Sequence, residues 1–149
     1  NKNFFFSTMV KGKISVPQRQ PYFNNRALGY YENFVRGYEL YVVDGQKYVL
    51  NRNELKFKLY GHTTSLDDYL GDNQFSTIPL QIYIKTYIDL GWVKDHSYGY
   101  LNPLLDDTLL SGLGLGLDFV TFYDAVFRLE YSYNQLNEHG FFLHIGASI

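Results

Sequence analysis

The stretch LQIYIKTYIDLGWV, residues 80–93, alternates between apolar and polar side chains along its whole length. Successive side chains of a β-strand point to opposite faces of a sheet, so this period of two predicts a strand. On a helix, Ile82 and Ile84 would lie about 200° apart and the apolar residues would scatter. The predicted apolar face carries Leu80, Ile82, Ile84, Thr86, Ile88, Leu90 and Trp92, and the other face carries Gln81, Tyr83, Lys85, Tyr87, Asp89, Gly91 and Val93.

The same alternation recurs in five further segments. Most are close to the ~9–11 residues of a strand that spans a membrane. Six strands are too few to close a bacterial barrel, which has about eight or more. The sequence therefore predicts an all-β chain that forms about six C-terminal strands of a larger transmembrane antiparallel β-barrel. The five further segments are residues 4–16, 48–60, 110–122, 125–134 and 141–149.

Aromatic residues make up 19% of the chain, with 15 Tyr and 12 Phe. The amphipathic ring of Tyr suits a boundary between lipid and water. No apolar run approaches the ~18 residues of a transmembrane helix, and residues 1–10 lack the layout of a signal peptide. We therefore expect any membrane insertion to use strands, and the chain to begin partway through a longer sequence.

Several classes of function have no support in the sequence. The formal net charge of −2 argues against a nucleic-acid partner, and the absence of cysteine excludes disulfides and cysteine zinc sites. We expect no catalytic residue, no cofactor and no metal. The acidic pairs Asp67-Asp68 and Asp106-Asp107 are interpreted as solvated loop acids rather than calcium ligands. No metal-ligand spacing relates the four histidines, which are His62, His96, His139 and His144.

The lengths of the connections predict an orientation. Outer-membrane barrels place long loops outside the cell and short turns on the periplasmic side. With the long loop 17–47 outside, the short connection 123–124 is periplasmic and the last strand ends on that side. The connection 61–79 is then longer than expected for a periplasmic turn.

Two motifs, in order along the chain, resemble a known family. The loop stretch Val35-Arg36-Gly37-Tyr38 resembles the Val-Arg-Gly-Phe/Tyr signature of the superfamily that contains BamA-type outer-membrane assembly factors and two-partner-secretion translocators. Leu28-Gly29-Tyr30 resembles its lead-in. Tyr87 to Val93 resembles its aromatic-x-Asp-x-Gly-x-Val strand motif. The C-terminal segments resemble its last strands, except that Ile149 stands where the family usually ends with an aromatic residue.

This resemblance implies a sixteen-stranded barrel whose long loop folds back into the lumen. The implied function is assembly and insertion of β-barrel proteins into the bacterial outer membrane. The implied partners are outer-membrane lipids, nascent outer-membrane proteins, and periplasmic or surface accessory lipoproteins. The alternatives are a two-partner-secretion translocator, a passive outer-membrane channel, or a soluble β-sandwich that acts as a binding module.

Asp89 lies on the predicted lumen face and needs a cationic partner. We hypothesise that Arg36 pairs with it in a two-pronged geometry that lysine cannot reproduce, and so anchors the loop inside the barrel. Gly37 would allow a tight turn beside Arg36. The alternative is that Arg36 is solvated and that Asp89 pairs with Lys85, Arg52 or Lys56.

Glycines mark two further strands. Gly112, Gly114 and Gly116 share the lumen face of one strand, where they either admit the inserted loop or bend the sheet. The final strand is interpreted as one side of a lateral seam, with its pairing weakened by Gly140 and Gly146. Its candidate residues are Gly140, Phe141, Phe142, Leu143, His144, Ile145, Gly146 and Ile149.

Overall fold

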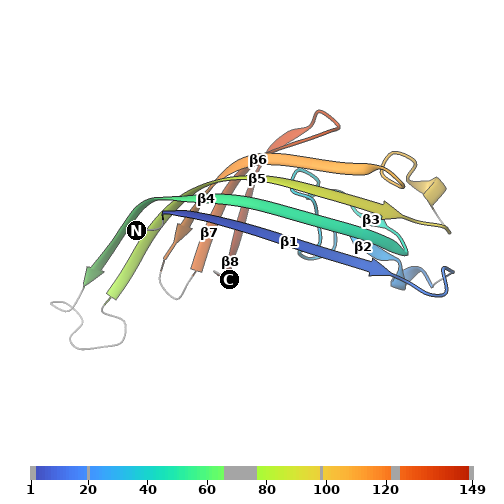
Figure 1. The fold of residues 1–149 in the computed structure, drawn as a ribbon, viewed down its shortest axis with the longest axis horizontal. Coiled ribbons are helices and arrows are strands. Elements are labelled where there is room, and N and C mark those ends of the chain that lie inside the picture. The colour runs from blue at the N-terminus through green and yellow to red at the C-terminus, as the bar shows by residue number, and fades with distance from the viewer. Residues whose placement is uncertain (1–2, 20, 66–76, 98, 122–124, 148–149) are drawn as a thin grey trace.

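The computed structural model describes residues 3–19, 21–65, 77–97, 99–121 and 125–147. Within these residues, six strands form one antiparallel sheet in the order β1-β4-β5-β6-β7-β8 (Figure 1). The all-β prediction and the antiparallel sheet of six strands are confirmed. The strands of this sheet are β1 (Phe4–Ile14), β4 (Lys47–Ser65), β5 (Thr77–Lys94), β6 (Leu109–Val120), β7 (Ala125–Asn134) and β8 (His139–Ala147).

The strand boundaries differ from the predicted ones chiefly between β4 and β5. The segment 61–79 was expected to be a loop, yet Gly61, His62 and Thr63 continue β4 and pair with Gln81, Leu80 and Pro79 of β5. Residues 61–65 are polar apart from a glycine, so they show no alternation that would predict a strand. Asp67, Asp68, Phe122, the 123–124 turn, Ser148 and Ile149 lie outside the described residues.

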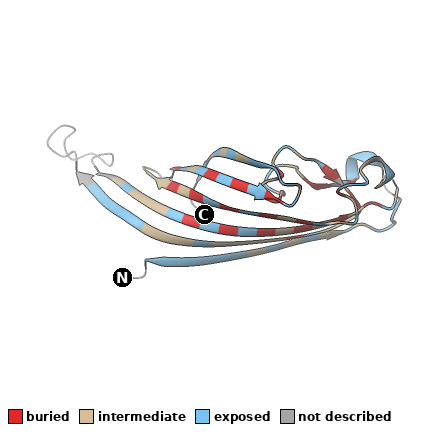
Figure 2. Ribbon diagram, turned by 90° about the horizontal axis from the view of Figure 1, so that it is seen from above, coloured by how far each residue is buried: buried red, intermediate tan, exposed pale blue. Residues whose placement is uncertain are grey.

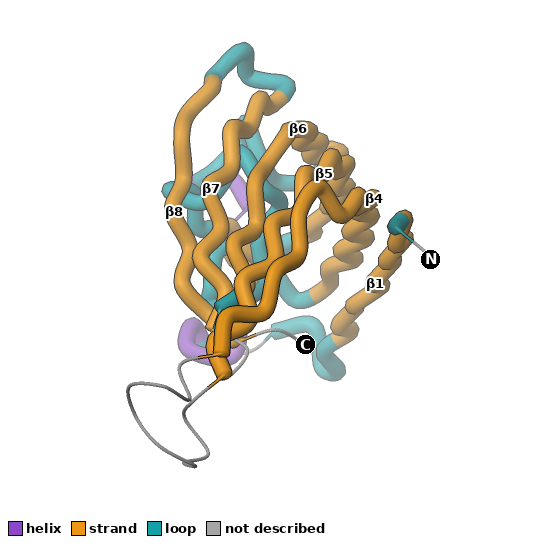
Figure 3. The backbone as a smooth tube through the Cα atoms, turned by 90° about the vertical axis from the view of Figure 1, so that its left-hand side faces the viewer, coloured by secondary structure: helices purple, strands orange, loops and turns teal. Residues whose placement is uncertain are grey.

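The sheet is strongly curved, and its two edges do not meet (Figure 3). In the described residues, β1 pairs with β4 and β8 pairs with β7, and neither edge strand has a second neighbour. The sheet is therefore not closed as a barrel within the described residues. Its connections at one end are residues 15–46, 95–108 and 135–138.

Charged side chains are buried on one face of the sheet, and apolar side chains are exposed on the other. Asp89 on the concave face is 0% exposed, whereas Ile88 and Leu115 on the convex face are 51% and 59% exposed. Figure 2 shows the resulting alternation of buried and exposed residues along the strands. The predicted parity holds through β5, β6 and β7. In β4, an irregularity between Lys58 and Tyr60 leaves both Leu59 and Tyr60 exposed, so the alternation ends there.

The connection from β1 to β4 folds back against the concave face. It contains a short helix, η1 (Tyr22–Asn24), and a two-stranded sheet formed by β2 (Arg26–Leu28) and β3 (Val43–Asp44), none of which the alternation predicted. The connection from β5 to β6 contains η2 (Gly99–Leu101). No helix in the described part of the chain is long and apolar enough to cross a membrane.

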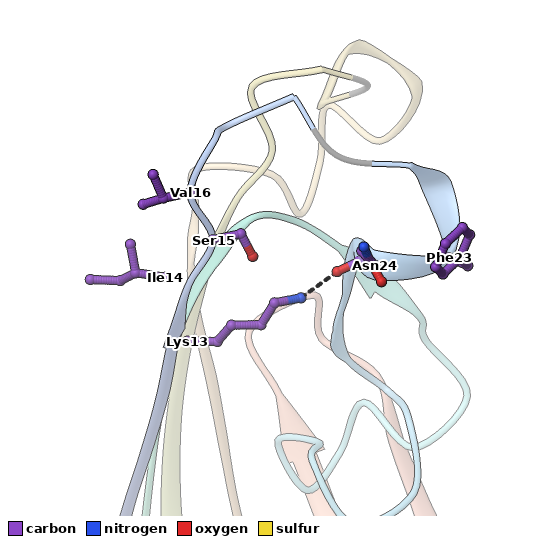
Figure 4. Close-up of a pocket in the computed structure, with 6 residues that line it drawn as sticks. All are labelled: Lys13, Ile14, Ser15, Val16, Phe23 and Asn24. Atoms are coloured by element: carbon purple, nitrogen blue, oxygen red, sulfur yellow. Dashed lines mark hydrogen bonds between the residues drawn. The ribbon is translucent and has the colours of Figure 1, made fainter.

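A small apolar core forms where this loop meets the sheet. Leucine and valine side chains of β4, β5 and β6 pack there against the loop. Lys13 of β1 also fastens the loop, because its Nζ donates to the backbone oxygens of Asn24 at 2.5 Å and Arg26 at 2.9 Å. Figure 4 shows the bond to Asn24, beside a shallow pocket lined by Ile14, Val16 and Phe23. The core residues are Ala27, Leu28, Val35, Tyr38, Val43, Leu50, Val93, Leu105 and Leu110.

Candidate functional site

Arg36 of the loop and Asp89 of β5 form a buried bidentate ion pair. Arg36 Nε donates to Asp89 Oδ2 at 2.8 Å and Nη2 donates to Oδ1 at 2.7 Å. The backbone N–H of Arg36 also donates to Oδ2, at 3.2 Å. Arg36 is 3% exposed and Asp89 is 0% exposed. The structure thus brings together the two residues that the sequence paired, 53 positions apart, and Arg36 is not solvated.

The rest of the guanidinium is also occupied. Its Nη1 donates to Glu54 Oε2 of β4 at 2.5 Å and lies 3.6 Å from Glu130 Oε1 of β7. Its Cζ lies 3.7 Å from the centre of the Tyr87 ring, a cation–π distance. The Tyr87 hydroxyl is in turn hydrogen-bonded to the hydroxyl of Ser132, with 2.5 Å between the oxygens. One loop residue thereby contacts β4, β5 and β7, and one of its partners, Tyr87, also links β5 to β7 through Ser132.

Of the three alternative partners of Asp89, one contacts it and the other two contact different carboxylates. Arg52 does contact Asp89, with 3.4 Å between Nε and Oδ2, so this carboxylate faces two arginines. Lys85 instead lies 2.7 Å from Asp118 and 2.6 Å from Glu130. Lys56 contacts Glu54 and Asp118 rather than Asp89.

These contacts join into one charged network on the concave face. Among the described residues, four cationic side chains of the network meet four carboxylates. Burying charges costs free energy unless they are paired, so removing any one member leaves an uncompensated charge. The cations are Arg36, Arg52, Lys56 and Lys85, and the carboxylates are Glu54, Asp89, Asp118 and Glu130.

The turn after Arg36 is held by β7. Gly37 adopts a φ of +94°, a conformation that favours glycine. Its backbone N–H donates to Glu39 Oε2 at 2.7 Å, and its carbonyl oxygen accepts from Asn134 Nδ2 at 2.8 Å. The sequence did not single out Asn134, although its parity in residues 125–134 places it on the lumen face.

The valine of the loop motif fits against the glycine of the strand motif. Val35 is 1% exposed, and a Cβ built on Gly91 would lie 2.5 Å from Val35 Cγ2. Any side chain at position 91 would therefore require the Val35 and Leu28 side chains of the loop to shift. The strand motif thus has three roles toward the loop: Tyr87 stacks on the guanidinium, Asp89 pairs with it, and Gly91 leaves space for Val35.

The glycine stripe of β6 combines two functions. A Cβ on Gly112 would collide with the backbone oxygen of Arg36, so this glycine admits the inserted loop. At Gly114 the Cβ would meet the backbone oxygen of Tyr131 and the phenol group of Tyr87, and at Gly116 it would first meet Lys85. The loop-approach interpretation is therefore correct for Gly112. The other two glycines instead leave room for side chains of β5 and for the neighbouring backbone of β7.

The predicted seam strand lies at the sheet edge. Phe141, Leu143 and Ile145 project from the convex face and are 74%, 67% and 68% exposed. His144 points to the other face, and its Nε2 lies 3.4 Å from Glu130 Oε2. Phe142 and Gly140 are partly buried. A Cβ on Gly146 would meet no atom within 4 Å.

One group of described residues has the composition of a metal site. Ligand atoms of Glu39, Glu130 and His144 lie within 4.8 Å of one another. Their spacing along the chain gives no sign of this, because they come from the loop, β7 and β8. Glu130 is already paired with Lys85, and Arg36 lies 3.6 Å away. These cations would repel a metal ion, so we assign no metal to the group.

Sequence reasoning missed several groups that hold the loop. The alternation of residues 48–60 and 125–134 puts Glu54 and Glu130 on the polar side of their strands, but nothing in the sequence assigns them to Arg36. Glu138 lies in the turn after β7, and its carboxylate accepts from the hydroxyl of Tyr41 at 2.7 Å. No sequence signal relates these two residues, which are 97 positions apart.

No protein-family model, curated protein or solved structure matches the chain.

Proposed function

We propose that this chain is the C-terminal part of an outer-membrane β-barrel that assembles and inserts other barrel proteins. The single observation that carries the proposal is the pairing of Arg36 with Asp89 beneath a loop folded onto the concave face. These two residues belong to the two motifs through which the sequence resembles the BamA-type superfamily. The contact therefore supports both ends of that resemblance at once.

The membrane part of the proposal rests on polarity. Large apolar side chains cover the convex face of strands at the centre and at both edges, whereas paired charges occupy the concave face. Apolar surfaces of this extent indicate contact with lipid or with another protein. In a soluble β-sandwich the apolar face would be the enclosed one. Lipid on the convex side and a wet lumen on the concave side account for both faces.

The assembly mechanism follows from the edges of the sheet. Every backbone polar group within lipid needs a hydrogen-bond partner, so a complete barrel must close between its first and last strands. In our proposal β8 is the last strand, and its weak closure allows a client strand to add there by β-augmentation. Lipids, nascent outer-membrane proteins and accessory lipoproteins are the partners that this function requires. No cofactor is needed, because strand exchange is not a covalent reaction.

A reversible lock on β8 tests the mechanism. In the full-length protein, one cysteine replaces a residue of β8 and a second replaces its neighbour on the first strand of the barrel. We expect the oxidised protein in liposomes to lose client insertion and the reduced protein to regain it. Full insertion by the locked protein would overturn the proposed mechanism.

A second pair of cysteines provides the matched control. Leu129 of β7 and Leu143 of β8 are directly opposite each other and both project from the convex face. A disulfide between cysteines at these two positions joins strands that are already paired, and leaves the outer edge of β8 free. Insertion should therefore persist in this variant. Single-channel conductance without any insertion activity would instead favour a passive channel.

A further inference from the structure

The loop also reaches the edge strand β8, through an aromatic contact outside the four-residue motif. The ring of Phe34 stacks on the imidazole of His144, with 6.0 Å between centroids and 23° between planes. Phe34 directly precedes Val35 and Arg36, so any movement of the docked motif moves this ring. His144 belongs to the only strand of the sheet that we assign to the seam.

Phe34 contacts the opposite part of the sheet as well. The guanidinium of Arg52, on β4, lies 5.1 Å from the centre of the Phe34 ring. Three strands separate β4 from β8 in the sheet order, so backbone pairing alone connects them only indirectly. Phe34 thus bridges the concave face between strands that are not neighbours.

His144 also lies beside a carboxylate of the Arg36 network. Its Nε2 lies 3.4 Å from Glu130 Oε2, and the other oxygen of Glu130 contacts Lys85 at 2.6 Å and Arg36 at 3.6 Å. The loop and β8 therefore share two partners, the Phe34 ring and the Glu130 carboxylate. Shared partners are the condition under which two positions couple energetically.

We propose that His144 is a positioning residue that couples docking of the loop to closure of β8. When the motif is docked, Phe34 and Glu130 hold His144 against the concave face and stabilise the edge strand. When the loop leaves, His144 loses its stacking partner and β8 opens more readily. This inference rests on the proposed function for its biological meaning, but the coupling itself is a property of the described residues.

A double-mutant cycle measures the coupling. The full-length protein in lipid nanodiscs carries Phe34→Ala, His144→Ala, or both, and amide hydrogen exchange is followed in residues 139–147. We expect Phe34→Ala to exchange about fivefold faster in β8, His144→Ala to exchange at least as fast because it also loses Glu130, and the double variant to be no faster than His144→Ala. Phe34→Tyr, which keeps the ring, should exchange at the wild-type rate.

The control is a β8 residue on the other face. Leu143→Ala removes an outward side chain, so its effect on exchange should simply add to that of Phe34→Ala. Additive effects of Phe34→Ala and His144→Ala, or unchanged exchange in His144→Ala, would overturn the coupling. Because client insertion does not enter this measurement, failure of the coupling and failure of the proposed assembly function are distinguishable.

Discussion

Strands β5 and β8 share one alternating pattern but are restrained very differently. β5 has neighbours on both sides, and its inward Lys85, Tyr87 and Asp89 are buried. Among the described strands, β8 pairs with β7 alone, and its inward His144 keeps 32% of its side-chain surface exposed. The loop contacts β5 through the buried Arg36 ion pair and β8 through a ring contact. Alternation thus reports which face a residue occupies, whereas restraint depends on the strand's place in the sheet and on the loop.

The largest expected effect comes from removing the Arg36–Asp89 ion pair, which holds the loop against β5. Arg36→Ala leaves Asp89 buried without its main cationic partner, which costs about 3–5 kcal/mol for a buried pair. We expect the loop to undock, and residues 15–46 to become sensitive to protease in the full-length protein. Arg36→Lys keeps the charge but loses the two-pronged geometry, so its loop should show intermediate sensitivity. Wild-type protease resistance in Arg36→Ala would contradict the anchoring role.

The second prediction concerns the convex face of the sheet, to which β5, β6 and β8 all contribute apolar side chains. Leu115, on the convex face of β6, is 59% exposed. In a barrel, Leu115→Lys places a charge in hydrocarbon and costs about 2–4 kcal/mol near the bilayer midplane. On the surface of a soluble protein the same change costs at most about 0.5 kcal/mol. Urea unfolding of the full-length protein in lipid vesicles measures the difference.

Gln135→Lys is the matched control for this substitution. Gln135 lies in the turn between β7 and β8 and is exposed, so the added charge remains in water. Its unfolding midpoint should equal that of the wild type. An equally small effect of Leu115→Lys would contradict lipid contact at the convex face.

The parts of the fold that follow from local patterns were predictable. Period two located all six strands of the sheet, and parity placed Asp89, Glu54 and Glu130 on one face. Pairing of Arg36 with Asp89 was predictable only because two motifs resembled those of one family. A single buried carboxylate does not itself identify a partner 53 residues away.

The other contacts between distant loop and strand residues were not predictable. The short strands β2 and β3 satisfy backbone groups within the loop, and neither is long enough to show a period. Asn134, Glu138 and His144 contact the loop because the sheet curves around it. Curvature arises from the twist of all the strands together, so no segment of sequence encodes these distances by itself.

The third prediction compares a glycine of the centre with one of the edge. Gly112→Ala adds a Cβ that collides with the backbone oxygen of Arg36, and such overpacking typically costs about 1–3 kcal/mol. Gly146→Ala adds a Cβ in open space, so stability should change by at most about 0.5 kcal/mol. Urea unfolding and loop protease sensitivity should therefore separate the two variants. Equal behaviour would show that close approach at Gly112 does not restrain the loop.

The smallest expected effect lies where the loop meets the turn that begins β8. Hydrogen bonds from Asn134 and then from Tyr41 lower the pKa of Glu138 below its ordinary value. A lowered carboxyl pKa means that the contact stabilises the docked loop above the ordinary pKa of about 4.3, and that this stabilisation is lost as pH falls through the lower value. Between pH 7 and about 5 the contact should therefore remain intact.

Amide exchange in residues 38–42, corrected for intrinsic rates, can follow this contact between pH 7 and 3. Because Tyr41 and Glu138 are near the surface, the change in loop opening should be at most about fivefold. The comparison with Glu138→Gln isolates it from the buried carboxylates, since both proteins share those groups. The wild type should be the better protected at pH 7, and the difference between the two should shrink as the pH falls toward 3. A constant difference between them across this range would show that ionisation of Glu138 does not hold the loop, leaving Asn134 and the Arg36 pair as its restraints near β7.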